Sequence, residues 1–176
     1  MLITAANSIL VLVDLQQKLL PVIWHKDAML GQCLRLAHAA KLLGVPVLGT
    51  EQNPAGLGHN VDQIRSACEI TVTKTYFDAC KDGLLEALPP GRNSIVVTGC
   101  EAHVCMLQTA SGLMAHGYDV WIAADAVGSR KASDPDAALE RLRQNGARLT
   151  TTEMLIFEWL RGSDHPRFRE VLKLVK

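Results

Sequence analysis

The sequence has no excess of charge of either sign. Its 18 basic residues (Lys and Arg) balance 18 acidic residues (Asp and Glu), so the formal net charge at pH 7 is zero. It also has no block of Lys and Arg that would follow a phosphate backbone or an anionic membrane surface. We therefore expect no nucleic-acid partner.

Long apolar runs are missing as well. The longest run near the amino terminus, Ile9 to Val13, is closed by Asp14. A membrane-spanning helix needs about 20 apolar residues, so we expect no membrane partner. The 176 residues, of which 48% are hydrophobic and 20% charged, have the composition of an ordinary globular protein. One domain covering residues 1–176 is the prediction.

The cysteines lack the close spacing that is typical of disulfide-rich small domains, and the histidines lack the spacing that is typical of metal sites. The five cysteines include no CxxC pair, and a chain of this size needs no disulfide bonds to fold. A reducing, cytoplasmic location is therefore the prediction, with packing roles for Cys33, Cys68, Cys80 and Cys100. The six histidines include no HxH or HxxxH pair, so we predict no bound metal and no cofactor.

Short apolar runs rich in β-branched residues alternate with segments of helical periodicity. We expect strands at 8–13, 45–48, 70–73, 94–98, 118–123 and 147–150. We expect helices at 27–43, 103–116, 135–145, 153–160 and 166–175, and a long loop at 51–60. Right-handed crossovers between such strands predict one Rossmann-like, three-layer α/β/α domain with a six-stranded, mostly parallel sheet.

Three of the predicted strands end in residues capable of chemistry. Asp14 follows the first strand, Lys74 the third, and Cys105 comes shortly after the fourth. Ligands of parallel sheets gather at the carboxyl ends of the strands, so these side chains are expected to meet there. Taken singly, Asp14 is equally well explained as a cap of the following turn, and Lys74 as a charge that leaves a strand for solvent.

Cys105 lies at the start of a predicted helix, directly after a strand and a glycine-led turn. Peptide N–H groups and the positive helix end at such a position stabilise an anion and predict a lowered thiol pKa. His103 is separated from Cys105 by a single residue, which turns the two side chains about 200° apart on a helix. We therefore expect His103 to line a pocket or the surface, with no Cys/His dyad.

The motifs at the three strand ends resemble those of the isochorismatase-like hydrolase superfamily. They are Val13-Asp14-Leu15-Gln16, Lys74-Thr-Tyr-Phe77 and Gly99-Cys-Glu-Ala-His-Val-Cys105, and the resemblance runs over nearly all of the chain. Residues 50–58 and 99–109, with the ending His165-Pro-Arg-Phe-Arg-Glu, are most similar to the isochorismatase domain-containing proteins.

This resemblance implies a hydrolase that cleaves an amide-type carbon–nitrogen bond of a small-molecule substrate through a thioester. Cys105 would be the nucleophile, Asp14 the acid and base, and Lys74 the cation of a triad. Further implications are a cis Cys100–Glu101 peptide bond and a homo-oligomer. The expected substrate-binding residues are Gln16, Glu51, Gln52, Tyr76, Phe77, Glu101, His103 and Val104.

Two departures from relatives narrow the substrate. Residues 51–59 lack the DxH pattern of metal-binding nicotinamidases, which argues against nicotinamide. Cys105 argues against the vinyl ether of isochorismate, because that ether is cleaved without a cysteine nucleophile. Two other functions stay open: a binding or scaffold protein that retains the triad without useful catalysis, and a redox-sensing thiol with Cys100 as its resolving partner.

Overall fold

The computed structural model describes residues 2–176, which form one six-stranded sheet in the order β3-β2-β1-β4-β5-β6. Every neighbouring pair of strands is parallel. The strands are β1 (Ser8–Val13), β2 (Val47–Gln52), β3 (Ile70–Lys74), β4 (Ser94–Cys100), β5 (Asp119–Gly128) and β6 (Arg148–Thr150). The helices are α1 (Lys26–Leu42), α2 (Pro54–Leu57), α3 (Asp62–Ala67), α4 (Leu84–Ala87), α5 (Leu107–Ala115), α6 (Asp134–Gln144), α7 (Thr152–Leu160) and α8 (Phe168–Val175).

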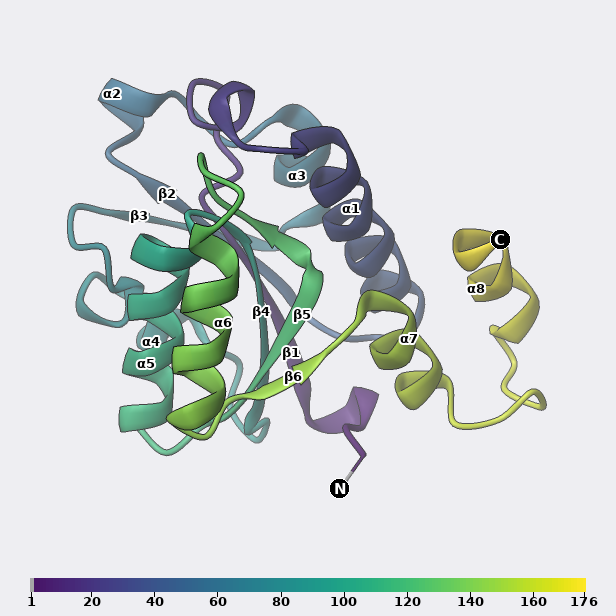
Figure 1. Cartoon of the computed structure of the whole chain (residues 1–176). Helices are drawn as coiled ribbons and strands as arrows, with labels where there is room; N and C mark the ends of the chain where they lie inside the picture. Colours follow the sequence, from purple (N-terminus) through teal and green to yellow (C-terminus); the bar gives the residue numbers. More distant parts are fainter. Residues whose placement is uncertain (1) are drawn as a thin grey trace.

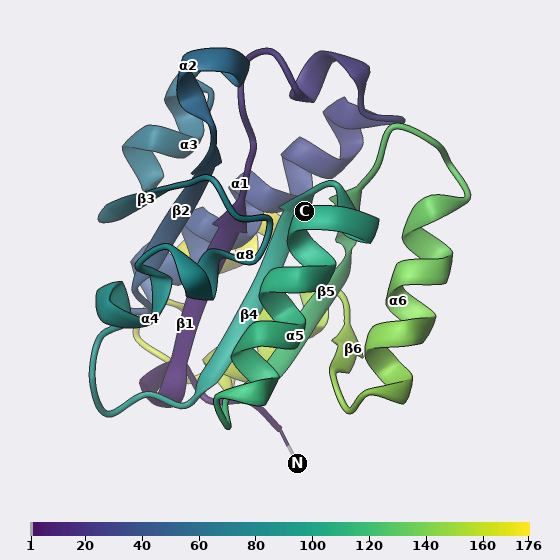
Figure 2. The ribbon, with the colours of Figure 1, turned by 90° about the vertical axis from the view of Figure 1, so that its left-hand side faces the viewer.

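Helices cover both faces of this sheet, which confirms the predicted three-layer α/β/α class. Helices α1, α3, α7 and α8 lie on one side (Figure 1). Helices α4, α5 and α6 lie on the other and face the viewer in Figure 2. Because both faces are covered, every residue of β1 and β4 is buried. Alternate residues of β1 feed two separate apolar cores, Leu10 and Leu12 on the α1 side and Ile9 and Val11 on the α5 side.

Four strands run past their predicted ends, β3 and β4 by one and two residues, and β2 and β5 by four and five. Strand β2 continues to Gln52, because Glu51 and Gln52 pair in register with Thr73 and Lys74 of β3. Strand β5 continues to Gly128 and pairs with β4 beyond a register shift. In both strands polar residues interrupt the apolar pattern before the pairing stops, so the predicted ends fell short.

The predicted helix at 103–116 is divided in the structure. Its first part is a π-helical turn, Ala102–Met106, and α5 follows it. The carbonyl of Glu101 accepts hydrogen bonds from the N–H groups of both Val104 (2.9 Å) and Met106 (3.3 Å), and the second of these is the wide i→i+5 bond of a π-turn. The turn brings Cys105 to the edge of the sheet.

None of the helices among residues 2–176 combines the length and the apolar character that crossing a membrane would require.

Candidate active site

The strand order places the candidate site at the switch point of the sheet. The chain passes from β1 outward to β2 and β3, and then returns to β4 on the other side of β1. Loops that leave the carboxyl ends of β1 and β4 therefore diverge, and such divergence opens a crevice where ligands of α/β folds bind. The structure brings Asp14, Lys74 and Cys105 together at this crevice.

Asp14 is a fully buried carboxylate held in place by several hydrogen bonds. Its Oδ1 accepts from the Thr50 hydroxyl at 2.7 Å, and its Oδ2 accepts from Lys74 Nζ at 2.8 Å. Its backbone takes the left-handed conformation (φ 53°) that non-glycine residues rarely adopt. Such strain persists where the surroundings fix the conformation, and here Thr50 and Lys74 hold the carboxylate in place.

Lys74 ends β3 and is 1% exposed, so it does not leave the strand for solvent. Besides Asp14, its Nζ contacts the side-chain oxygen of Gln52 at 2.7 Å. Gln52 in turn donates its amide hydrogen to the carbonyl of Thr75 at 2.8 Å. The ammonium group therefore lies between a carboxylate and an amide oxygen, as a buried cation requires.

The Cys105 sulfur lies 4.0 Å from the side-chain oxygen of Gln52. Burial, and after it the Asp14 carboxylate, raise the pKa of the Cys105 thiol to about 12, while Lys74 acts in the opposite direction. The expectation of a lowered thiol pKa is therefore wrong for the free protein. Its helical position favours an anion, but burial and the neighbouring carboxylate outweigh that effect. At neutral pH the thiol is protonated.

The turn before Cys105 is made without a cis peptide bond. Among residues 2–176 all peptide bonds are trans, so the expected cis bond between Cys100 and Glu101 is wrong. The reversal is achieved instead by two positive φ angles, 121° at Gly99 and 54° at Glu101. A side chain at Gly99 would overlap the backbone of Val13, so only glycine lets β4 pass β1 this closely.

Cys105 opens into a pocket of about 380 Å³ at the crevice. A volume of this size lies at the lower end of the range for small-molecule sites. The pocket is lined by ten residues from five segments of the chain: Lys18, Leu19, Val22, Gln52, Leu57, Phe77, Glu101, Val104, Cys105 and Arg130. Four of the residues expected to bind substrate are among them, namely Gln52, Phe77, Glu101 and Val104.

The other four expected binding residues, Gln16, Glu51, Tyr76 and His103, lie outside this lining. Gln16 is fully buried behind it, where its side chain donates to the carbonyls of Gln52 (3.0 Å) and Gly58 (2.6 Å) and accepts from the Gln52 N–H. Gln16 therefore holds the end of β2 and the loop that follows it through these hydrogen bonds. Tyr76 is an exposed neighbour of Phe77 whose ring lies under the Lys81 ammonium, 5.6 Å from the ring centre.

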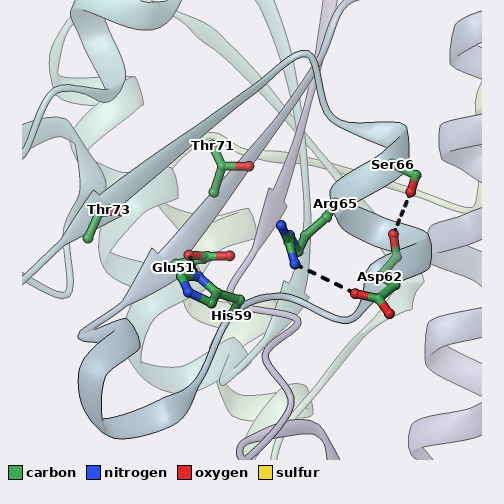
Figure 3. A pocket seen from close by; sticks show the side chains of 7 residues that line it. All are labelled: Glu51, His59, Asp62, Arg65, Ser66, Thr71 and Thr73. Atoms are coloured by element: carbon green, nitrogen blue, oxygen red, sulfur yellow. Dashed lines mark hydrogen bonds and ion pairs between the residues drawn. The ribbon is translucent and has the colours of Figure 1, made fainter.

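Glu51 points to the opposite face of the sheet from Cys105. Side chains alternate along β2, so Thr50 and Gln52 face Asp14 and Lys74 while Glu51 faces α3. There it belongs to a second pocket, of about 550 Å³, in which Thr71 and Thr73 of β3 lie beside Glu51 and His59 (Figure 3). Both carboxylate oxygens of Glu51 are occupied, one by the N–H of Asn60 (2.8 Å) and one by the His59 ring (2.9 Å). Glu51 thus fastens the loop after β2.

His103 lies beside a cluster of polar groups rather than beside the thiol. Its Nδ1 is 3.0 Å from the Ser129 hydroxyl and 3.3 Å from the Glu101 carboxylate, and its Nε2 is 3.4 Å from Asp134. One oxygen of Glu101, Oε2, is buried with no hydrogen bond within residues 2–176. The Nδ1 atom of His103 is the ring nitrogen near that oxygen, and its contacts with Ser129 and Glu101 hold the histidine against the turn that carries Cys105.

Several residues that line the pocket were not predicted from the sequence. Arg130 follows the carboxyl end of β5, which the sequence analysis placed five residues too early. Lys18, Leu19 and Val22 come from the loop after β1, and Leu57 from α2, neither of which has a diagnostic pattern. In the described part of the chain, no three His, Cys, Asp or Glu side chains converge in a way that could hold a metal ion.

Comparison with known proteins places these features in a family. The isochorismatase domain model matches residues 8–154. "Isochorismatase domain-containing protein 1" of Danio rerio is 35% identical over 99% of this chain, and the chain spans 62% of that relative's length. The structure named MAR1 ribonuclease from Caenorhabditis elegans is 37% identical, with a TM-score of 0.93 over 99% of this chain and 92% of that one.

A more distant structure shares only the fold. The YcaC gene product of Escherichia coli, described as an octameric hydrolase of unknown specificity, is 22% identical with a TM-score of 0.84, and the match covers 98% of this chain and 95% of that one.

Proposed function

Because this chain belongs to the isochorismatase family, we propose that it is a small-molecule hydrolase that cleaves an amide-type carbon–nitrogen bond through a thioester on Cys105. The observation that carries the proposal is the buried Lys74–Asp14 ion pair beside the Cys105 thiol, which lines a pocket at the carboxyl ends of the strands. A carboxylate base, a cation and a nucleophile at one point are the parts that covalent hydrolysis requires.

In the proposed acylation step, the Cys105 sulfur attacks the amide carbonyl carbon while Asp14 takes the thiol proton. The tetrahedral intermediate then collapses, the carbon–nitrogen bond breaks, and Asp14 returns the proton to the leaving amine. Since the pKa of the free thiol is about 12, proton transfer accompanies attack rather than preceding it. Asp14 therefore acts as a base during the attack. Before the attack, its negative charge disfavours the thiolate form of Cys105.

In the proposed deacylation step, Asp14 takes a proton from a water molecule as the water attacks the thioester carbonyl. The carbon–sulfur bond breaks, the acid leaves, and the thiol is restored with the proton from Asp14. Lys74 stabilises the negative charge that passes between sulfur and carboxylate, as its opposing effect on the Cys105 pKa indicates. The N–H of Cys105 would hold the oxyanion, because the N–H groups of Val104 and Met106 already donate to the Glu101 carbonyl, and one such donor is worth roughly 3 kcal/mol.

The substrate search tests this proposal. Purified protein is incubated with a library of small primary and secondary amides, and release of amine is measured with wild type, Cys105→Ala and Cys33→Ala. Cys33 is the control because its thiol is fully buried on the other side of the sheet. Hydrolysis that Cys105→Ala abolishes and Cys33→Ala retains supports the proposal, and equal turnover by all three proteins contradicts it.

The scaffold and redox alternatives give different outcomes. A silent scaffold would bind a ligand without any loss of the amide bond. A redox pair would need Cys100 to reach Cys105, yet Cys100 is fully buried and burial raises the pKa of its thiol well above the ordinary value. Treatment with hydrogen peroxide followed by peptide mapping separates the two: a Cys100–Cys105 disulfide would favour the redox function.

RNA is a rival substrate, because the Caenorhabditis elegans structure is named a ribonuclease. The balanced charge of this chain and its pocket of about 380 Å³ with mostly apolar walls favour a small molecule. Fluorescence anisotropy with a labelled single-stranded RNA decides the matter. No binding at micromolar protein is expected, whereas saturable binding that alkylation of Cys105 blocks would favour RNA.

We also propose that the chain forms a homo-oligomer in a reducing, cytoplasmic setting. Several large apolar side chains are exposed near the candidate pocket, including Val22, Trp24, Tyr76 and Phe77. All five cysteines are free, as a reducing setting requires. By contrast, Trp121 and Trp159 are buried in the core and take no part in such a contact. Light scattering that gives the 19.2 kDa of one chain at micromolar concentration would contradict assembly.

A further inference from the structure

The pocket of about 550 Å³ on the α3 side of the sheet is separate from the candidate active site and has no part in the proposed hydrolysis (Figure 3). A pocket of this volume has room for a small organic molecule. Its lining consists of polar side chains alone, so it offers a ligand hydrogen bonds in place of apolar contact. They come from β2, the loop after it, α3 and β3: Glu51, His59, Asp62, Arg65, Ser66, Thr71 and Thr73.

Two threonine hydroxyls face this pocket because side chains alternate along β3. Val72 and Lys74 are buried on the side of the active site, whereas Thr71 and Thr73 are exposed on the α3 side. Residues two apart on one face of a strand are separated by about 7 Å. Each hydroxyl can donate one hydrogen bond, so the pair can contact different oxygens of one ligand.

Arg65 supplies a cation that is free to bind a ligand. Its side chain extends from α3 toward the strands (Figure 3) and is 53% exposed. The ion pair between its Nη1 and the Asp62 carboxylate is 3.6 Å long, which is too long for a hydrogen bond. The guanidinium therefore keeps a planar fork of N–H donors for an incoming group. Such a fork matches the oxygens of a phosphoryl group.

The buried carboxylate of the lining leaves no free oxygen to face an anion. Glu51 has a side chain that is 5% exposed, and its two oxygens are taken by the N–H of Asn60 and the ring of His59. The contact with Glu51 engages Nδ1 of His59, so Nε2 is the ring nitrogen that remains for a ligand. Nε2 accepts a hydrogen bond from a hydroxyl when the ring is neutral and donates one when the ring is protonated.

The acceptors of the pocket lie on α3. Asp62 is 87% exposed in its side chain and has a carboxylate that can accept from hydroxyls. Ser66 donates its own proton to the Asp62 carbonyl at 2.8 Å, so its oxygen is left as an acceptor (Figure 3). The pocket therefore combines a cation and hydroxyl donors with separate acceptors, which suits a ligand that carries both an anionic group and hydroxyls.

We propose that this pocket binds a phosphorylated sugar or polyol. The phosphoryl oxygens accept hydrogen bonds from Arg65, Thr71 and Thr73. The hydroxyls of the ligand contact His59, Asp62 and Ser66. A nucleotide is a poorer match, because the lining has no aromatic or aliphatic side chain against which a base would stack.

Isothermal titration calorimetry with three phosphates and their parent compounds tests the site. The phosphates are ribose 5-phosphate, glucose 6-phosphate and glycerol 3-phosphate, the parents are ribose, glucose and glycerol, and inorganic phosphate is titrated alongside. We expect at least one of the phosphates to bind about tenfold or more tightly than its parent, as for one charge-assisted pair of hydrogen bonds. The same compound should also bind more tightly than inorganic phosphate.

Variants locate the binding. Arg65→Gln should weaken binding of the best phosphate by about tenfold or more, and Thr71→Val, which keeps the shape but removes the hydroxyl, by about fivefold. Both side chains are exposed, so neither substitution should prevent folding. Arg141→Gln is the matched control, because it removes the same charge from an exposed position on α6, across the sheet from this pocket (Figure 2). It should leave the affinity unchanged.

A failure of all three phosphates to bind at millimolar concentration overturns the proposal, as does equal affinity of wild type and Arg65→Gln. The pocket next to Cys105 also contains cations, Lys18 and Arg130. Binding that Arg130→Gln weakens and Arg65→Gln does not would place the ligand there and contradict this site. Inorganic phosphate that binds as tightly as the best of the three compounds would contradict a sugar or polyol ligand.

Discussion

Lys74 and Asp14 form an ion pair of 2.8 Å in which neither side chain has any exposed surface. Removal of two charges from water costs free energy. The pair is tolerated because Asp14 also accepts a hydrogen bond from the Thr50 hydroxyl, and Lys74 also donates one to the Gln52 side chain. A pair of this kind adds little to the stability of the fold compared with apolar packing. Its placement beside Cys105 is therefore best explained by function.

Replacement of Lys74 by Met should destabilise the protein by about 3 to 5 kcal/mol, because it leaves the Asp14 carboxylate buried without its cation. A surface lysine at the same strand end would cost under about 0.5 kcal/mol. Urea unfolding measures the difference, with Lys173→Met as control, since Lys173 is exposed on α8. A Lys74→Met protein as stable as the control would show that the pair is not buried in solution.

The same variant should slow alkylation of Cys105 by about tenfold or more, because Lys74 lowers the pKa of that thiol and its loss leaves Asp14 unopposed. The rate of iodoacetamide labelling at pH 8, followed by peptide mapping, measures this effect. Any loss of folded protein is corrected with the unfolding data. Labelling at the wild-type rate would make Lys74 a purely structural residue.

Alkylation of wild-type Cys105 should rise steadily with pH, about tenfold per unit, from pH 6 to pH 10. A pKa of about 12 leaves the thiolate a minor species throughout that range, so its population grows with each unit. Labelling rates at half-unit intervals test this. A plateau near neutral pH would mean that a stable thiolate exists before substrate binds, and would contradict proton transfer during attack.

Stability should fall above pH 9. The pKa values of Cys33, Cys68 and Cys80 are each raised from 9.0 to about 12 in the folded protein, mainly by burial. A raised thiol pKa favours the folded state fully below pH 9, and the advantage is lost as the pH rises from 9 toward 12. Each thiol contributes a slope of up to about 1.4 kcal/mol per pH unit. Urea unfolding in reductant at pH 8 and pH 10 measures the slope, and Cys33→Val should reduce it; an unchanged slope would mean that Cys33 takes no part.

Gly99→Ala should cost more than about 3 kcal/mol, because the new methyl group overlaps the Val13 backbone and φ is 121°. Gly31→Ala is the matched substitution: Gly31 lies in α1 with open space around it, and should gain about 0.5 to 1 kcal/mol. Thermal unfolding of the two variants measures the loss of stability in Gly99→Ala and the gain of stability in Gly31→Ala. A mild effect at Gly99 would show that β4 can move away from β1.

Much of the site follows from the sequence, because parallel strands bring their carboxyl ends to one edge. This rule alone joins Asp14, Lys74 and Cys105, which lie far apart in the chain. The position of Glu51 could not be predicted with this rule. The sequence ended β2 before this residue, and only its pairing with Thr73 reveals that the side chain alternates to the other face.

Other features depend on neighbours that no local pattern encodes. The ammonium of buried Lys74 depends on Asp14 and Gln52 for its hydrogen bonds. The high pKa of Cys105 results from burial and from Asp14, which is distant in sequence. Arg130 joins the pocket only because β5 continues to Gly128 across a register shift. The type of each element was predictable, while its end point and its depth were set by tertiary contacts.

The most direct test of the account is the chemical form of Cys105 during turnover of an amide. Protein is mixed with the best amide from the library, quenched in acid within seconds, and analysed by intact mass spectrometry and peptide mapping. The account predicts an added mass equal to the acyl group, located on Cys105, removed by hydroxylamine and absent from Cys105→Ser and from Asp14→Asn. Continued amide hydrolysis by Cys105→Ser at the wild-type rate, with no acyl group on the wild-type protein, would contradict it.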